Sequence, residues 1–163
     1  MQLVKVSRKY VQDIYSKVDK EVMINHPPKK GEKEKDRLNA LLVRIKYRGK
    51  NREFAIPLSH AIKIKHNHKM TYFGLDNYDE KNQTIGGLYL KKCLPVNRSI
   101  YELAEIKKDP FLTVQKIIDD NESSIIKKFK TYLDEYISKE AKGWGFRYST
   151  NIDAILNYMD KNY

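Results

Sequence analysis

The 163-residue sequence contains one cysteine, Cys93, which excludes a disulfide framework and a cysteine-rich zinc site. Because Cys93 lies among apolar residues, we expect a buried structural thiol. No apolar run is long enough to span a bilayer, and the opening MQLVKVSRKY lacks the apolar core of a signal peptide. These absences predict a cytoplasmic protein without a membrane partner.

The motifs of two enzyme classes are also missing. Gly86 and Gly87 are too short a match for a glycine-rich phosphate loop. No G-x-S-x-G sequence occurs, and neighbours such as Ser59 and His60 have diverging side chains on a regular strand. A serine-hydrolase triad is therefore disfavoured.

Histidines supply little support for a metal site. His66 and His68 are two residues apart and would share a face of a strand. A zinc site needs at least a third ligand, and only Asp76 and Asp79 follow, in a loop-like stretch. We therefore expect neither a metal nor a cofactor.

Positive charge is what the chain has in excess. Its 32 lysines and arginines exceed its 21 acidic residues by 11, which favours RNA, DNA or an anionic membrane surface as a partner. Twelve tyrosines add flat groups that can stack on bases, although most are expected in the core or at its rim. The cluster of Trp144, Phe146 and Tyr148 could likewise pack the last helix or stack on bases.

Hydrophobic periodicity predicts an α+β fold, a single domain over residues 1–163 with helices over a mostly antiparallel sheet. A polar loop is expected at 26–36, and Arg48-Gly49-Lys50-Asn51 predicts a hairpin turn. We expect strands at 2–6, 41–47, 52–58 and 70–73, and one or two within 86–96, interrupted near Lys91. We expect helices after Ser7, at 99–106, after Asp109-Pro110, at 125–137, and after a cap at Ser149 or Thr150.

The stretch FAIPLSHAIKIKHNHKM, residues 54–70, carries the candidate chemistry. Three of the four histidines lie here with several lysines and no acidic residue, following a buried strand. Imidazole suits proton transfer near neutral pH, and cations stabilise the charge of a phosphorane. This set fits RNA cleavage by the substrate's own 2'-OH. The candidate catalytic residues are Ser59, His60 and Lys63 at the strand end, joined by Arg37, Lys35 or Lys33 from the preceding loop.

Other cations are candidate phosphate contacts along a basic groove: Lys29, Lys30, Lys65, His66, His68, Lys69, Lys91 and Lys92. The residues alone leave two alternatives open. One is a non-catalytic RNA-binding or ribosome-associated protein. The other is a DNA-binding regulator, although the helices are more mixed in charge than the loops of the first half.

The sequence resembles the ToxN/AbiQ toxins of type III toxin–antitoxin systems over nearly its whole length. The similar features are a basic loop, a hairpin, an IPLS-type strand end followed by lysines, the segment GGLYLKKCLPV, DPF, and a short final helix after NIDAIL. It resembles a divergent, CptN-like branch more than ToxN itself. Pro57 and Leu58 match the family pattern, and Ser59 takes its first hydroxyl position.

The sequence departs from that pattern at two positions. His60 stands where the family has a second serine, and Lys63 comes slightly later than the family lysine. The proton shuttle is therefore expected at His60. Arg37, with Lys35 next to it, would be the family's basic residue before the second strand.

The resemblance implies a metal-independent endoribonuclease that leaves 2',3'-cyclic phosphate and 5'-hydroxyl ends. It implies an antitoxin made of repeat RNA, cut by the toxin and folded as pseudoknots in the basic groove. It also implies a compact, twisted sheet related to Kid/MazF-like ribonuclease toxins, and a closed assembly of alternating protein and RNA units.

Overall fold

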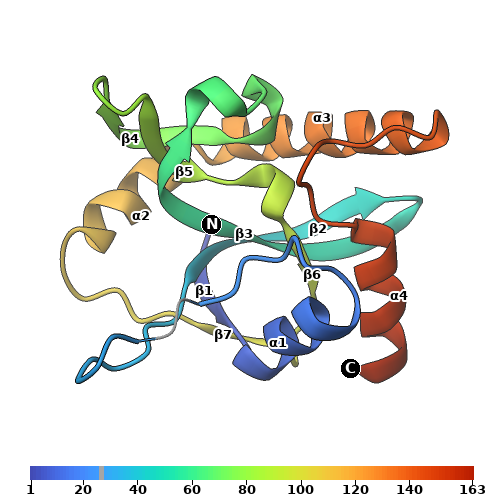
Figure 1. Ribbon diagram of the computed structural model, residues 1–163, viewed down its shortest axis with the longest axis horizontal. Helices are drawn as coiled ribbons and strands as arrows, with labels where there is room; N and C mark the ends of the chain where they lie inside the picture. Colours follow the sequence, from blue (N-terminus) through green and yellow to red (C-terminus); the bar gives the residue numbers. More distant parts are fainter. Residues whose placement is uncertain (26–27) are drawn as a thin grey trace.

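The computed structural model describes residues 1–25 and 28–163 and confirms the α+β fold (Figure 1). Its strands are β1 (Leu3–Val6), β2 (Leu38–Tyr47), β3 (Lys50–Lys63), β4 (Phe73–Asp79), β5 (Thr84–Leu88), β6 (Leu94–Val96) and β7 (Tyr101–Leu103). Its α-helices are α1 (Arg8–Lys17), α2 (Phe111–Asp120), α3 (Glu122–Ala141) and α4 (Ile152–Asn162). Three short 3-10 turns, η1 (Ile64–His66), η2 (Lys69–Thr71) and η3 (Leu90–Lys92), interrupt the middle of the chain.

The strands form an antiparallel sheet in the order β4-β5-β3-β2-β1-β7, with β6 paired to β3. The long strand β3 belongs to two parts of this sheet. Its first half pairs with β2 and β6, and its second half, from Leu58 to Lys63, pairs with β5. Because the pairing with β2 begins only at Asn39 and Pro57, the loop before β2 lies beside the second half of β3.

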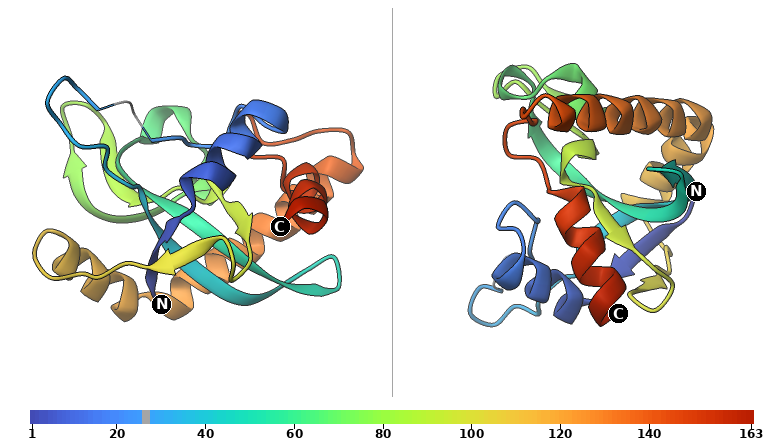
Figure 2. Two further views of the ribbon diagram at one scale, coloured as in Figure 1. Left: turned by 90° about the horizontal axis from the view of Figure 1, so that it is seen from below. Right: turned by 90° about the vertical axis from the view of Figure 1, so that its right-hand side faces the viewer.

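Helices cover the sheet on both sides. In Figures 1 and 2, α3 runs across one face, while α1 and α4 lie on the other. Phe54 to Pro57 are all buried, as expected for a strand covered on both faces. The Phe54 ring meets that of Phe129 on α3 at 5.1 Å between centroids. From α1, the Tyr10 hydroxyl donates a 2.7 Å hydrogen bond to the Pro95 carbonyl on β6.

Local sequence explains several boundaries. The Ser7 side chain accepts from the Tyr10 backbone N–H and caps α1, as predicted. The hairpin turn at Arg48 and Gly49 is also confirmed, with both residues at positive φ. The cap of α4 is Asn151, whose side chain accepts from the Ala154 N–H, so the predicted cap lay one or two residues too early.

Three predictions of secondary structure were wrong. Residues 99–106 contain no helix: Tyr101–Leu103 forms strand β7, because its pairing with β1 overrides the helical pattern. Residues 69–71 form a 3-10 turn, and the strand begins only at Phe73. The strand expected to end at Leu58 continues to Lys63 because β5 pairs with it.

Cys93 is fully buried, and burial raises the pKa of its thiol to about 12. The expected structural thiol is thus confirmed. Among the helices of the described residues, none is long and apolar enough to cross a membrane.

Candidate active site

A pocket of about 600 Å³ lies where the loop before β2 meets β3, β4, β5 and the start of α2. We call it the Ser59–His60 pocket. The loop contributes Asn25, Pro28, Lys29, Glu32, Lys33, Lys35, Asp36 and Arg37. The other lining residues are Leu38 at the start of β2 and Leu58, Ser59, His60, Leu75, Asp76, Asn77, Gly86, Gly87, Pro110, Phe111 and Val114. It therefore brings together Ser59, His60, Arg37, Lys35 and Lys33.

A β-bulge turns Ser59 and His60 toward the same space. Ser59 pairs with Gly87 and Ile62 with Ile85, so β3 has one residue more than β5 between these pairs. Such a bulge locally breaks the alternation of side chains and is common next to active sites. Ser59 and His60 both line the pocket, contrary to the divergence expected of neighbours on a regular strand.

Two glycines on β5 allow β4 to approach closely beside the pocket. A Cβ on Gly87 would lie 2.3 Å from the carbonyl oxygen of Phe73, and one on Gly86 would lie 2.9 Å from that of Asp76. Only glycine fits this close approach of β4 and β5. Gly86 and Gly87 are themselves buried, so they let β4 lie tightly against β5 where both strands line the pocket.

Arg37 is held beside Ser59 by its backbone. Its N–H donates to the Asn25 side chain at 3.1 Å, and its carbonyl accepts from the Asn39 side chain at 3.1 Å. The register that pairs Asn39 with Pro57 would place Arg37 across from Ser59. The guanidinium donates from Nη1 to the Leu58 carbonyl at 3.2 Å.

The guanidinium of Arg37 is half-buried and incompletely paired. Within residues 1–25 and 28–163, its Nε is buried and has no hydrogen-bond partner. Burial lowers the pKa of Arg37, yet an arginine stays charged at neutral pH. Because Nε is buried, an anion such as phosphate would be bound by the donors of the guanidinium that are not buried.

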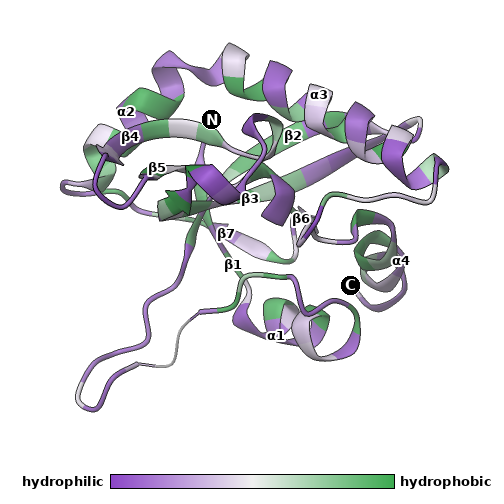
Figure 3. Cartoon of the chain, turned by 45° about the horizontal axis from the view of Figure 1, so that its top comes forward, coloured by the Kyte–Doolittle hydropathy of each residue, from purple (hydrophilic) through white to green (hydrophobic). Residues whose placement is uncertain are grey.

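Cations exceed carboxylates around the pocket. The charged lining residues are Lys29, Lys33, Lys35 and Arg37 against Glu32, Asp36 and Asp76, with His60 in addition. Of these acids, Asp36 already accepts a 2.6 Å hydrogen bond from Arg8 Nε, and this bond raises the pKa of Arg8. The loop residues leading to β2 form a nearly continuous hydrophilic stretch (Figure 3).

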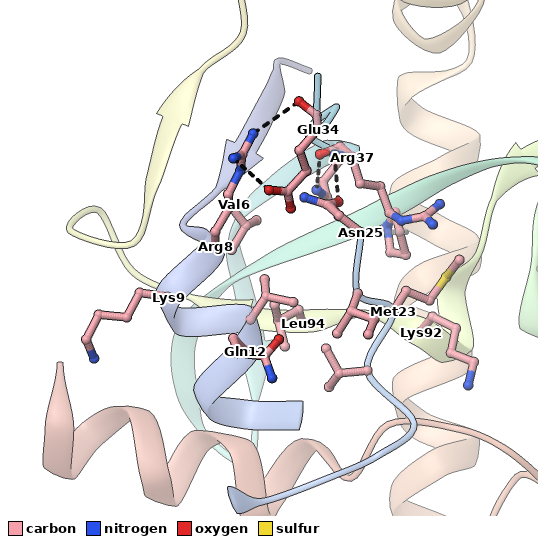
Figure 4. A pocket seen from close by; sticks show the side chains of 15 residues that line it. Val6, Arg8, Lys9, Gln12, Met23, Asn25, Glu34, Arg37, Lys92 and Leu94 are labelled. Atoms are coloured by element: carbon pink, nitrogen blue, oxygen red, sulfur yellow. Dashed lines mark hydrogen bonds and ion pairs between the residues drawn. The ribbon is translucent and has the colours of Figure 1, made fainter. Parts of the chain in front are cut away.

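A smaller pocket of about 340 Å³ adjoins the first and shares Asn25 and Arg37 with it. Figure 4 shows Arg8 reaching Glu34 on its rim, where Nη1 donates to the Glu34 carboxylate at 2.9 Å. Together with the Arg8–Asp36 pair, this contact ties the loop before β2 to α1. The loop that carries the pocket's cations is thereby positioned.

Eight predicted site residues are absent from the described lining of the Ser59–His60 pocket, and four of these have exposed side chains. Lys63, Lys65 and His66 are exposed beyond the bulge, on the end of β3 and on η1, and Lys30 is exposed in the loop. Their roles stay predictions. The histidine at position 26 lies outside the described residues.

Two predicted phosphate contacts need correction. Lys91 is only 5% exposed, and its Nζ donates to the Arg147 carbonyl at 3.2 Å. Lys92 Nζ donates to the carbonyl and the carboxylate of Glu21, at 2.9 and 2.7 Å. Both ammonium groups therefore already have hydrogen-bond partners within the protein. Two adjacent lysines suggest a surface position, but here segments distant in sequence pack against them.

His68 and Lys69 belong to a separate cation cluster. They line a shallow pocket with Lys127 and Lys128 of α3, which sequence reasoning missed. Lys128 Nζ lies 5.4 Å from the centre of the Tyr72 ring, and desolvation lowers its pKa. The sequence of α3 did not indicate that Lys127 and Lys128 would face η2, because lysines occur on several sides of this helix.

The aromatic cluster near α4 divides between the two expected roles. Phe146 stacks on Tyr132, with ring centroids 5.1 Å apart, and so packs against the core. Trp144 and Tyr148 are 73% and 56% exposed, which leaves stacking on bases a prediction for them.

Metal ligands do not converge in the part of the chain that the structure covers: no three His, Cys, Asp or Glu side chains there could hold an ion.

No family model and no curated protein sequence matches this chain. Its structure, in contrast, matches solved structures along almost the entire chain. A protein of a bacterial antiviral system regulated by a processed non-coding RNA gives a TM-score of 0.69 at 16% identity, over 99% of this chain and 98% of that one. The chain has the fold of that protein.

Two further structures agree. AbiQ, a lactococcal anti-phage endoribonuclease of the type III toxin–antitoxin system, gives a TM-score of 0.69 at 14% identity, over 98% of this chain and 96% of AbiQ. A structure of a bacterial type III system, in which a non-coding RNA pseudoknot selectively inhibits the toxin, gives 0.61 at 12% identity, over 98% and 96%. The expected resemblance to ToxN/AbiQ proteins is thus confirmed for the fold. The relation to Kid/MazF-like toxins stays a prediction.

Proposed function

We propose that this chain is an endoribonuclease toxin of a type III toxin–antitoxin system, and that it cleaves RNA without a metal ion. The observation that carries the proposal is the Ser59–His60 pocket, which is lined by a hydroxyl, an imidazole and a half-buried guanidinium. Three exposed lysines of the loop, Lys29, Lys33 and Lys35, form its rim. A fold shared with an anti-phage endoribonuclease supports it. The net charge of +11 fits an RNA substrate.

In the proposed reaction the 2'-oxygen attacks the adjacent phosphorus, and the 5'-oxygen leaves. The products are a 2',3'-cyclic phosphate and a 5'-hydroxyl. His60 is the one imidazole among the pocket's described lining residues, and it would carry a proton in this exchange. Arg37 would bind a non-bridging phosphate oxygen, where negative charge grows in the transition state, and Ser59 would orient the phosphate.

The proposed inhibitor is an RNA antitoxin, made of repeats, folded as a pseudoknot and processed by the toxin itself. The similarity to a type III structure with an inhibitory pseudoknot supports this partner. The lysines of the pocket rim and the His68–Lys69 cluster would contact its phosphates, in an assembly of alternating protein and RNA. We place both RNAs, and the protein, in the cytoplasm.

The test is cleavage of a mixed-sequence RNA in EDTA by the parent protein and by His60→Ala. General acid–base catalysis contributes about 100- to 10,000-fold, so we expect a loss of at least about 100-fold. In a second variant, His60→Ala with Ala61→His, the imidazole moves by one residue at unchanged composition, and we expect no recovery. Lys46→Ala, on an exposed strand position away from the pocket, serves as the control.

Two results would count against the proposal. Cleavage by His60→Ala at the parent rate would remove the imidazole from the mechanism. Intact RNA together with tight, salt-sensitive binding by the parent and by His60→Ala would indicate a non-catalytic RNA-binding protein instead.

A further inference from the structure

The Ser59–His60 pocket has an apolar wall that the proposed chemistry does not use. This wall consists of Leu38, Leu58, Leu75, Pro110, Phe111 and Val114. Phe111 stands out because 43% of its surface is exposed, although it is a large apolar side chain at a pocket. Phosphate, hydroxyl and imidazole groups have no need of such a surface.

The position of Phe111 follows from the amphipathic stripe of α2. Phe111, Val114 and Ile118 are spaced by three and four residues and so lie on one face of the helix. Ile118 is fully buried, Val114 is half-buried and Phe111 is exposed. The stripe thus starts in the core and ends at the pocket, which Phe111 and Val114 line. Helix α2 contacts β4 there (Figure 1).

We infer that this wall binds a nucleobase of the RNA next to the cleaved phosphate, with Phe111 stacking on the base. The inference rests on the proposed function and names the part of the substrate that the same pocket recognises. A nucleotide combines a flat apolar base with an anionic phosphate. The pocket combines a flat apolar ring with Arg37 and the lysines of the rim.

The charge and the volume of the pocket both favour a nucleotide as its ligand. Four basic side chains against three acidic ones at the pocket favour an anionic ligand over a neutral apolar one. A volume of about 600 Å³ holds a nucleotide-sized group. Asp76 and Asn77 line the same pocket, and their polar atoms would give the subsite a means to discriminate among bases.

The neighbouring residue provides a matched control. Leu112 is 46% exposed, about as much as Phe111, and it follows Phe111 on the same helix. It is absent from the described lining of the pocket. Leu112→Ala removes a similar apolar surface without touching the proposed subsite.

The experiment is a double-mutant cycle that combines substitution of the Phe111 side chain with removal of single bases from the RNA. A short RNA with one cut site is prepared with an abasic nucleotide at each position flanking the cut. We expect that one abasic position lowers kcat/KM of the parent about 5- to 150-fold, the effect of losing one stacked base. With Phe111→Ala the same abasic position should cost less than about twofold, while Leu112→Ala should behave as the parent and Phe111→Trp should restore the sensitivity. Equal losses in parent and Phe111→Ala would overturn the inference.

A binding version separates this inference from the nuclease proposal. Oligoadenylate of five nucleotides, with an abasic nucleotide at each position in turn, is titrated by fluorescence anisotropy, which needs no cleavage. Coupling between one base and Phe111 would support the subsite even if the parent cuts no RNA. Absence of coupling at every position, with cleavage intact, would reject the subsite and leave the nuclease proposal standing.

Discussion

Gly87→Ala should separate β4 from β5 and damage the pocket that they help to form. The added Cβ would lie 2.3 Å from the Phe73 carbonyl oxygen and 3.1 Å from Gly74 Cα. An ordinary contact needs about 3.5 Å, so the strands must move apart by about 1 Å. Since the obstructing atoms are backbone, no flexible side chain can yield, and we expect a cost of about 3 kcal/mol, the upper part of the range for overpacking.

Thermal unfolding measures this cost. For a domain of this size, 3 kcal/mol corresponds to a melting temperature lower by about 6–12 °C. Gly145→Ala is the control because its new Cβ meets only the end of the Glu140 side chain, at 3.3 Å. RNA cleavage by Gly87→Ala should fall as well, below the unfolding temperature, because β4 carries Leu75 and Asp76 into the pocket. A melting temperature within about 1 °C of the parent would show that the close approach of the strands does not require glycine.

Three further predictions concern charged groups. Arg37→Met should lower cleavage at least about tenfold while changing stability by less than about 1 kcal/mol, because the loss of the Nη1–Leu58 hydrogen bond is offset by removal of a buried Nε that has no partner within the described residues; a larger loss of stability would contradict this. Lys127→Gln should reduce the slope of log affinity against log salt by nearly one unit for a structured RNA, and an unchanged slope would place the cation cluster outside the interface. The hydrogen bond from Arg52 lowers the pKa of Asp160, so the pair stabilises the fold above the ordinary carboxyl pKa of about 4 and loses this effect as pH falls further. Asp160→Asn should therefore be less stable by up to about 1 kcal/mol at pH 7 but equal to the parent near pH 2, as followed by urea unfolding, and a difference that persists at low pH would refute the linkage.

The sequence was sufficient for the elements that depend on neighbours along the chain. Ser7 and the Arg48–Gly49 turn are local features, and both were placed correctly. The hairpin also implied the main feature of the pocket. Antiparallel pairing of β2 and β3 brings the residue before β2, Arg37, toward the residue after Leu58, so the meeting of Arg37 and Ser59 could be anticipated.

Features that depend on distant contacts could not be anticipated. The bulge that turns His60 and Ser59 into one pocket arises only from pairing with β5. Lys91 has the sequence pattern of a surface cation, yet its Nζ lies 5.5 Å from the centre of the Tyr89 ring and 5.9 Å from that of Tyr148, which comes from far along the chain. Phe111 was assigned to a helix, but only the packing of that helix beside β4 shows that it lines the pocket.

The decisive measurement concerns the 2'-hydroxyl of the nucleotide that is cut. A short RNA is offered in EDTA either intact or with a single 2'-deoxy substitution at the cleaved position, and the ends of the products are identified. If the Ser59–His60 pocket promotes attack by the 2'-oxygen, the intact RNA yields 2',3'-cyclic phosphate and 5'-hydroxyl ends, and the substituted RNA is not cut there. Cleavage of the 2'-deoxy RNA at the same bond, or a 5'-phosphate end, would mean that water is the nucleophile and that the proposed mechanism is wrong.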